Sequence, residues 1–144
     1  MREIKFRAKR LDNGSWACGS GIVFCDDCCF LDKRDECYIQ QPYTFRGNTH
    51  FIELACIQCD KETVQQFTGM RDKNGIEIYE GDVIECWSEG VKARGVVQQR
   101  IDGEWFMYPA WQNAKMWHLM PDSNGDTSVE IVGNILDHKH LLDK

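Results

Sequence analysis

Long apolar runs are missing from this sequence. No run approaches the roughly 18 consecutive apolar residues that a transmembrane helix needs, so we expect no segment to span a membrane. The first ten residues, MREIKFRAKR, also lack the apolar core of a secretory signal. We therefore expect an intracellular, cytoplasmic protein whose cysteines are reduced thiols.

Recognisable catalytic motifs are missing as well. The chain contains no glycine-rich phosphate loop, no His-Glu-x-x-His motif and no nucleophile elbow. Its 23 acidic residues produce carboxylate pairs by number alone, and none of them stands out as a general acid–base couple. The sequence therefore predicts no catalytic residue, no small-molecule cofactor and no enzymatic activity.

The balance of charge is acidic, with a formal net charge of −6 over 144 residues, which disfavours nucleic acid on average. The N-terminus is the exception, because residues 1–10 carry five basic side chains against one acidic side chain. On a strand, Lys5, Arg7 and Lys9 share one face and the apolar residues between them share the other. This basic face is interpreted either as a solvated strand surface or as an arm that contacts phosphates.

Glycine turns divide much of the chain into short segments of β-forming residues. Asn-Gly or Asp-Gly pairs, which favour tight hairpin turns, occur at residues 13–14, 74–75, 102–103 and 124–125. Strands are predicted around these turns at residues 4–8, 83–87, 91–99, 105–108 and 129–135. This spacing predicts a mainly β fold, α+β at most, arranged as a small barrel or sandwich.

The distribution of cysteine suggests a boundary near residue 62. Seven of the eight cysteines precede this position, together with a stretch of looser, mixed polarity, and the regular hairpin series follows it. We therefore predict an N-terminal, β-rich, cysteine-containing region at residues 1–62 and a second domain at residues 63–144.

Two Cys-x-x-Cys pairs are the best candidates for a metal site. Cys25 and Cys28 form one pair, Cys56 and Cys59 form the other, and four thiolates can hold Zn²⁺ tetrahedrally. The separation between the pairs is longer than the usual spacing of zinc sites. The cysteines are therefore interpreted either as structural zinc ligands, as buried or idle thiols, or as a redox pair.

An aromatic and methionine-rich run extends from Trp105 to Met120. One strand and one loop of a small domain can hardly bury all of it, so part is predicted to enter the core. The surplus is predicted to form an exposed apolar patch that contacts another chain. Alternatively, Trp105 or Trp111 with Arg94 and Arg100 can present a stacking surface for single-stranded nucleic acid.

Three blocks of the sequence stand out in order along the chain. They are the opening MREIKFRAKRLDNGSW, the central QQFTGMRDKNGIEIYEGDVIE and the closing VEIVGNILDHKHLL. These blocks resemble the YopX family, a set of small bacteriophage and prophage proteins. Within the central block, residues 74–75 are predicted to be a hairpin tip and residues 79–82 a turn that leads into a long strand.

The resemblance implies an SH3-type β-barrel in the C-terminal half, with a variable N-terminal β-rich region packed against it. It also implies multi-chain assemblies, which suits the aromatic surplus. The biochemical function of the family is uncharacterised, so the resemblance implies no catalytic or binding residue.

Two hypotheses for function follow. The first is a non-enzymatic phage or prophage accessory protein that forms homo-oligomers and acts as an interaction module. The second is an accessory protein that binds nucleic acid through the basic N-terminal strand and a surface of tryptophan and arginine, although fold alone does not fix function.

Overall fold

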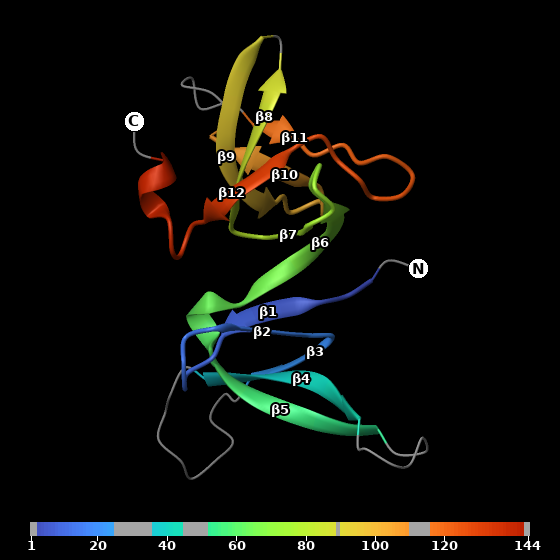
Figure 1. Ribbon diagram of the computed structural model, residues 1–144, viewed down its shortest axis with the longest axis vertical. Coiled ribbons are helices and arrows are strands. Elements are labelled where there is room, and N and C mark those ends of the chain that lie inside the picture. Colours follow the sequence, from blue (N-terminus) through green and yellow to red (C-terminus); the bar gives the residue numbers. More distant parts are fainter. Residues whose placement is uncertain (1–2, 25–35, 45–51, 89, 110–115, 143–144) are drawn as a thin grey trace. The chain divides into compact units, whose positions relative to one another are not determined.

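The computed structural model describes residues 3–24, 36–44, 52–88, 90–109 and 116–142. Within these residues the chain forms twelve short strands and two 3-10 turns, and all paired strands are antiparallel (Figure 1). The predicted mainly β fold is confirmed.

The chain separates into two compact units. The first unit extends from Glu3 to Gln66 and the second from Phe67 to Lys144. The boundary predicted near residue 62 falls within the 3-10 turn η1, Lys61–Thr63, a few residues before the division between the units.

The described residues of the first unit form five complete strands. They are β1 (Phe6–Lys9), β2 (Trp16–Gly19), β3 (Gly21–Phe24), β4 (Glu36–Thr44) and β5 (Ile52–Asp60). β1 pairs with β2 and with the first two residues of β6 (Gln65–Arg71), while β3, β4 and β5 form a three-stranded sheet. Gly19 allows β2 to approach β4, because a side chain there would collide with the carbonyl oxygen of Gln40.

The described residues of the first unit form a core of small side chains and one isoleucine. Its buried members are two alanines, two cysteines and one isoleucine: Ala8, Ala17, Cys37, Ile39 and Cys59. The alternation predicted for the N-terminal strand is present, because Ala8 is fully buried while the neighbouring Arg7 and Lys9 lie over the ring of Trp16.

The second unit is built around a five-stranded antiparallel sheet with the order β11-β10-β9-β8-β12. Its strands are β8 (Asp82–Ser88), β9 (Val91–Gln99), β10 (Trp105–Tyr108), β11 (Trp117–His118) and β12 (Glu130–Asn134). β7 (Glu77–Tyr79) pairs with the rest of β6, and the 3-10 turn η2 (Lys139–Leu142) ends the described chain. The described strands close no barrel, so the SH3-type detail stays a prediction.

The described core of the second unit is larger and comes from most of its strands. Its buried members are Met70, Ile78, Ile84, Cys86, Ala93, Val97, Trp105, Met107, Leu119 and Val129. Trp105, Met107 and Leu119 of the aromatic run therefore belong to the core, and part of the run was predicted to do so. Tyr108, Met116 and Met120 of the same run are exposed.

Candidate functional site

An open hollow with a mostly apolar wall lies within the second unit. It is a cavity of about 630 Å³ lined by residues 68–70 of β6, by Glu104 and Trp105 at the start of β10, and by residues 118–121. Met70, Trp105, Leu119, Met120 and Pro121 make most of its wall apolar. We call residues 118–127 the strap, whose first four residues line this cavity, and we call the cavity the strap pocket.

The first end of the strap is held by the sheet. His118 pairs with Phe106 in the ladder between β10 and β11. One residue further on, the backbone N–H of Leu119 donates to the carbonyl oxygen of Trp105 over 3.0 Å. Leu119 is therefore fixed in the core, and the strap begins from a defined position.

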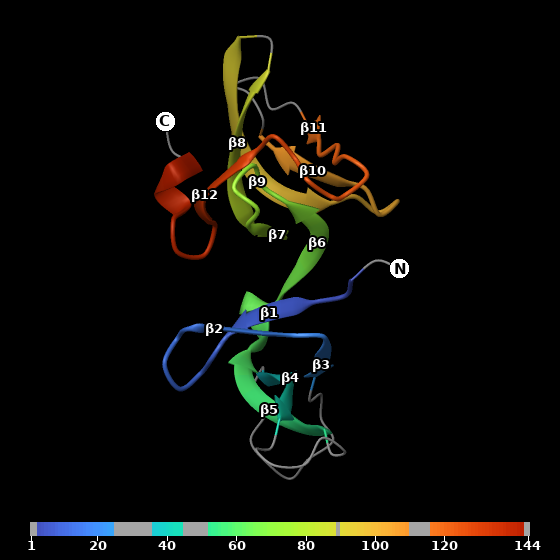
Figure 2. The ribbon, with the colours of Figure 1, turned by 45° about the vertical axis from the view of Figure 1, so that its right-hand side comes forward.

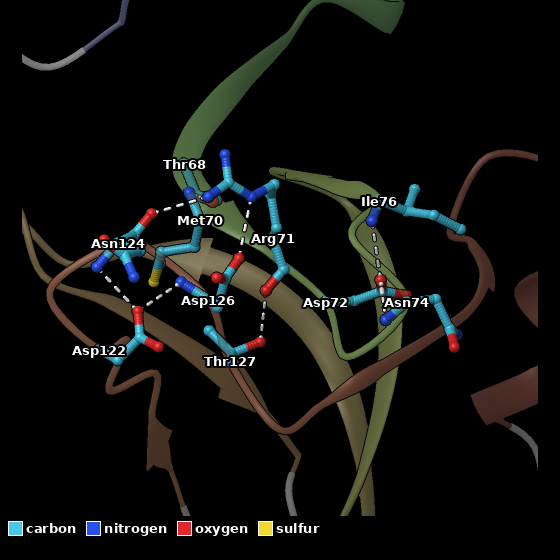
Figure 3. Close-up of polar contacts among 10 residues, drawn as sticks. All are labelled: Thr68, Met70, Arg71, Asp72, Asn74, Ile76, Asp122, Asn124, Asp126 and Thr127. Atoms are coloured by element: carbon cyan, nitrogen blue, oxygen red, sulfur yellow. Dashed lines mark hydrogen bonds and ion pairs between the residues drawn. The ribbon is translucent and has the colours of Figure 1, made fainter.

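The second part of the strap contains an Asp-x-Asn-Gly turn at residues 122–126. The Oδ1 atom of Asp122 accepts hydrogen bonds from the backbone N–H groups of Asn124 (2.8 Å) and Asp126 (3.0 Å), as Figure 3 shows. Gly125 takes a φ of 84°, which suits glycine. A side chain at Gly125 would also meet the carbonyl oxygen of Gly69 at 2.9 Å, so this glycine allows a close approach to β6.

A turn of the same design precedes β7, inside the block that resembles the YopX family. The Oδ1 atom of Asp72 accepts from the backbone N–H groups of Asn74 and Ile76, both over 2.9 Å (Figure 3). Unlike Asp122, Asp72 is only 2% exposed, and its Oδ2 atom accepts from the backbone N–H of Ile131 over 3.3 Å. The hairpin tip predicted at residues 74–75 is confirmed, with Gly75 at a φ of 81°.

Arg71 ties the strap to β6. Its Nε atom donates to Oδ1 of Asp126 over 2.9 Å, and its Nη2 atom donates to the carbonyl oxygen of Asn124 over 2.8 Å (Figure 3). The backbone adds a bond from the Arg71 N–H to the carbonyl oxygen of Gly125, and another from the Thr127 N–H to the carbonyl oxygen of Arg71. Two walls of the pocket, β6 and the strap, are therefore fixed to each other.

The polar groups of the pocket lie on the strands at its sides. Nδ1 of His118 lies 3.1 Å from Oε2 of Glu104, and both side chains are partly exposed. The hydroxyl of Thr68 donates to the carbonyl oxygen of Ile78. Nε1 of Trp105 is buried without a hydrogen-bond partner among the described residues. The pocket thus combines an apolar wall with a partly exposed carboxylate, and this arrangement suits an apolar group that carries a positive charge.

A second surface lies on the hairpin of β8 and β9. Glu85 is directly opposite Arg94, and Trp87 is directly opposite Lys92, so these four side chains share the outer face of the hairpin. Trp87 is 73% exposed, and Nζ of Lys92 lies 5.9 Å from the centre of its ring. We call these four residues the hairpin face.

Glu85 organises the hairpin face. Its carboxylate accepts from Nε of Arg94 over 2.6 Å and from Nη2 of the same residue, and it lies 3.0 Å from Nζ of Lys92. Burial acts to raise the pKa of Glu85, but the hydrogen bonds from Lys92 and Arg94 outweigh it and hold this pKa below its usual range. Nη1 of Arg94 also donates to the carbonyl oxygen of Leu141.

The residues predicted to form a nucleic-acid stacking surface lie in different environments. The prediction for Trp105 is wrong, because the side chain belongs to the core and is only 6% exposed. Trp111 lies outside the described residues. Arg94 is engaged by Glu85, and Nε of Arg100 lies 3.4 Å from Oδ2 of Asp102.

The exposed ring that sequence reasoning missed is Trp87. The alternation of side chains along a strand could have indicated this exposure. Cys86 is buried, so the side chain of Trp87 next to it points to the opposite, outer face. Gly90, which takes a φ of 77°, also marks the turn that follows.

The four cysteines predicted as zinc ligands differ in their surroundings. Cys25 and Cys28 lie outside the described residues. Cys56 is exposed and Cys59 is buried, because residues three apart on a strand point to opposite faces. The described part of the chain contains no group of three or more His, Cys, Asp or Glu side chains that could hold a metal ion. The four-cysteine zinc site stays a prediction.

Cys59 has a different close neighbour. It lies directly opposite Cys37 on β4, and both thiols are free and buried. Burial, together with the charge of a Cys59 thiolate, raises the pKa of Cys37 to about 11, and burial also raises the pKa of Cys59. These thiols are therefore in the protonated, unreactive form at neutral pH.

Fold and site together define a mainly β protein of two units, the second of which carries an open apolar pocket with a strap as one wall. The chain belongs to the YopX protein family, whose match covers residues 5–143. Among solved structures it is similar to the crystal structure of protein EF1440 from Enterococcus faecalis, with 16% sequence identity and a TM-score of 0.45. That match covers 97% of this chain and 98% of the other.

No curated protein matches the sequence. Across the residues that the structure describes, no helix has the length and apolar character needed to cross a membrane.

Proposed function

We propose that this protein is a non-enzymatic, cytoplasmic accessory protein of a phage or prophage, and that it acts as a homo-oligomeric interaction module. The contact surface is the strap pocket with the exposed end of the run from Trp105 to Met120. Membership of a family without an assigned activity agrees with this proposal but does not carry it.

The observation that carries the proposal is the exposure of apolar side chains beside an apolar hollow. Met120 lines the strap pocket and is nevertheless 78% exposed, and Met116 and Tyr108 of the same run are also exposed. Full burial of a methionine side chain contributes about 1.5–3 kcal/mol. A contact that covers this surface therefore stabilises an assembly, and methionine adapts to partners of irregular shape.

Replacing Met120 with lysine tests the proposal. A charge at this exposed position opposes burial in a contact without disturbing the core. We expect Met120→Lys to shift the mass measured by light scattering toward a single chain at micromolar concentration. Ile101→Lys is the matched control, because Ile101 is fully exposed on the turn between β9 and β10 and lies outside the pocket. Equal masses for the wild type and both variants would count against the proposal.

Nucleic-acid binding is the second candidate, and one observation in the first unit favours it. Cζ of Arg7 lies 4.5 Å, and Nζ of Lys9 5.4 Å, from the centre of the Trp16 ring, so two cations lie close to one aromatic ring. Arg7 also donates to Oε1 of Gln65.

Titration with single-stranded DNA over a series of salt concentrations tests this second candidate. Binding through phosphates predicts an affinity that falls steeply with salt and is weakened in an Arg7→Gln, Lys9→Gln variant. No binding at low salt would exclude it.

A further inference from the structure

We propose that the hairpin face of one copy inserts Trp87 into the strap pocket of a second copy, in a head-to-tail contact. This inference rests on the proposed function and names the partner of the pocket. The proposed occupant of the pocket is the ring of Trp87, accompanied by Lys92.

The exposure of Trp87 needs an explanation. An aromatic side chain buries roughly 150–250 Å² when it is covered, and tryptophan is the residue most enriched at the centres of protein contacts. Trp87 is instead 73% exposed, and Val91 across the hairpin is also exposed. Figures 1 and 2 both show the hairpin of β8 and β9 extending beyond β10, β11 and β12 of the same unit. The ring is therefore presented to a partner.

The hairpin face is held in one arrangement before any contact forms. The carboxylate of Glu85 binds Lys92 and Arg94 together, and Lys92 lies over the ring of Trp87. Fewer side-chain conformations are lost on association when the groups are already ordered. The hairpin face thus behaves as a preorganised apolar ring with a positive charge beside it.

The strap pocket complements this arrangement in size and charge. Its volume of about 630 Å³ falls within the roughly 300–1,000 Å³ range of pockets that enclose drug-sized groups, so it can admit one indole ring. Its wall is apolar, and Glu104 contributes a partly exposed carboxylate. A Lys92 that enters beside Trp87 meets the Glu104 carboxylate, and opposite charges across a contact select its register.

The contact is between copies because the pocket and Trp87 of one chain are separate. Trp87 is exposed and is not among the residues that line the pocket. A contact between two different surfaces is heterologous, so it generates a ring or a chain of copies rather than an isolated symmetric dimer. Because each copy uses two different surfaces, two variants that each lack one surface can be tested in a mixture.

The test mixes two variants of the full chain, each of which lacks one side of the contact. Trp87→Ala removes the ring and leaves the pocket intact. The pocket variant, Glu104→Lys with Met120→Lys, leaves the ring intact, and all three positions are exposed enough for the fold to persist. Circular dichroism confirms folding, and Ile101→Ala is the control for loss of an exposed apolar side chain.

We expect wild type and Ile101→Ala to assemble in sedimentation velocity runs. Trp87→Ala alone and the pocket variant alone should each dissociate, with at least a tenfold weaker association. Their equimolar mixture should form a dimer that contains one copy of each, because one productive contact remains. Trp87→Phe should retain most of the association.

The results that overturn the inference are distinct from those that overturn the proposed function. If wild type and Trp87→Ala assemble equally, or if the mixture stays monomeric, the pocket does not take Trp87, although the module still self-associates. If Trp87→Ala assembles normally but loses affinity for single-stranded DNA, the hairpin face binds nucleic acid instead. If wild type is a monomer, the proposed function itself fails.

Discussion

Two buried aspartates stabilise the turns at either end of β7. Asp72 accepts three backbone N–H groups, and Oδ2 of Asp82 accepts the backbone N–H of Tyr79 over 2.8 Å while its Oδ1 accepts from the side-chain amide of Asn134. A carboxylate with several hydrogen bonds satisfies backbone donors that would otherwise be buried without partners. The glycine- and aspartate-rich block around these residues is thus explained by folding and requires no ligand.

Replacing Asp72 with asparagine tests this explanation at a single atom. The amide oxygen of asparagine can still accept from Asn74 and Ile76, but its NH₂ group would face the N–H of Ile131, so two donors would meet. We expect a loss of about 1–3 kcal/mol in the free energy of unfolding in urea.

The matched control for this substitution is Asp122→Asn. Asp122 makes the same two turn bonds, but it is exposed, so the change should stay within about 0.5 kcal/mol. Equal losses at the two positions would contradict a special role for the third bond of Asp72.

Thiol chemistry gives a prediction that depends on pH. Burial raises the pKa of Cys37 from 9.0 to about 11. A group whose pKa is raised in the folded state stabilises the fold below its unfolded pKa, and that contribution is lost as the pH rises from 9 to 11. We expect stability to fall by roughly 2 kcal/mol over this window because of Cys37, and Cys37→Ala to make the decline shallower.

Alkylation of the native protein, mapped by mass spectrometry, tests which cysteine thiols are buried. At pH 8, the exposed Cys18 and Cys56 should be modified well before the buried Cys37, Cys59 and Cys86. Fast modification of Cys37 would show that β4 and β5 open more readily than their burial indicates.

At the scale of elements, the strap depends on contacts that are distant in sequence. Arg71 and Asp126 are 55 residues apart, yet their side chains form an ion pair and their backbones form a bridge. Both side chains are partly exposed, so the ion pair contributes at most about 1 kcal/mol. Its effect should therefore be local, on the strap and not on global stability.

Arg71→Ala should loosen the strap. Amide hydrogen exchange in residues 119–127 should accelerate by about fivefold, which corresponds to a loss of ~1 kcal/mol in local opening free energy. The rest of the second unit should be unaffected. Arg100→Ala is the control, since Arg100 pairs with Asp102 on the turn between β9 and β10. Unchanged exchange in the strap of Arg71→Ala would show that the backbone bonds alone hold it.

The sequence predicts those elements whose determinants are local. Glycines at positive φ, such as Gly75 and Gly103, mark the hairpins, and the predicted strands at residues 91–99 and 105–108 match β9 and β10. The strap pocket could not be predicted, because it requires Arg71 to reach a turn that lies far along the chain. Likewise, the burial of Trp105 depends on strands and a strap that cover both faces of β10, and composition does not reveal that.

At the scale of the whole molecule, the two units differ in the cores that support them. The described core of the first unit consists of small side chains and one isoleucine, whereas that of the second includes a tryptophan, two methionines and several branched residues. Apolar burial stabilises a unit. The described core of the second unit is therefore expected to be sufficient for this unit to fold without the first one.

A fragment that starts at residue 67 tests whether the second unit folds without the first one. Its core members all lie within the fragment, so we expect Phe67–Lys144 to fold by itself. Its amide nuclear magnetic resonance spectrum should overlay that of the full chain for most residues of the second unit. A collapsed, poorly dispersed spectrum would show that the second unit needs the first one to fold.

The central claim is that this protein is an interaction module that self-associates, and native mass spectrometry of the intact chain tests it most directly. At micromolar concentration we expect the main species at a multiple of the 16.7 kDa chain mass. A spectrum that contains only the single chain at that concentration would contradict the claim.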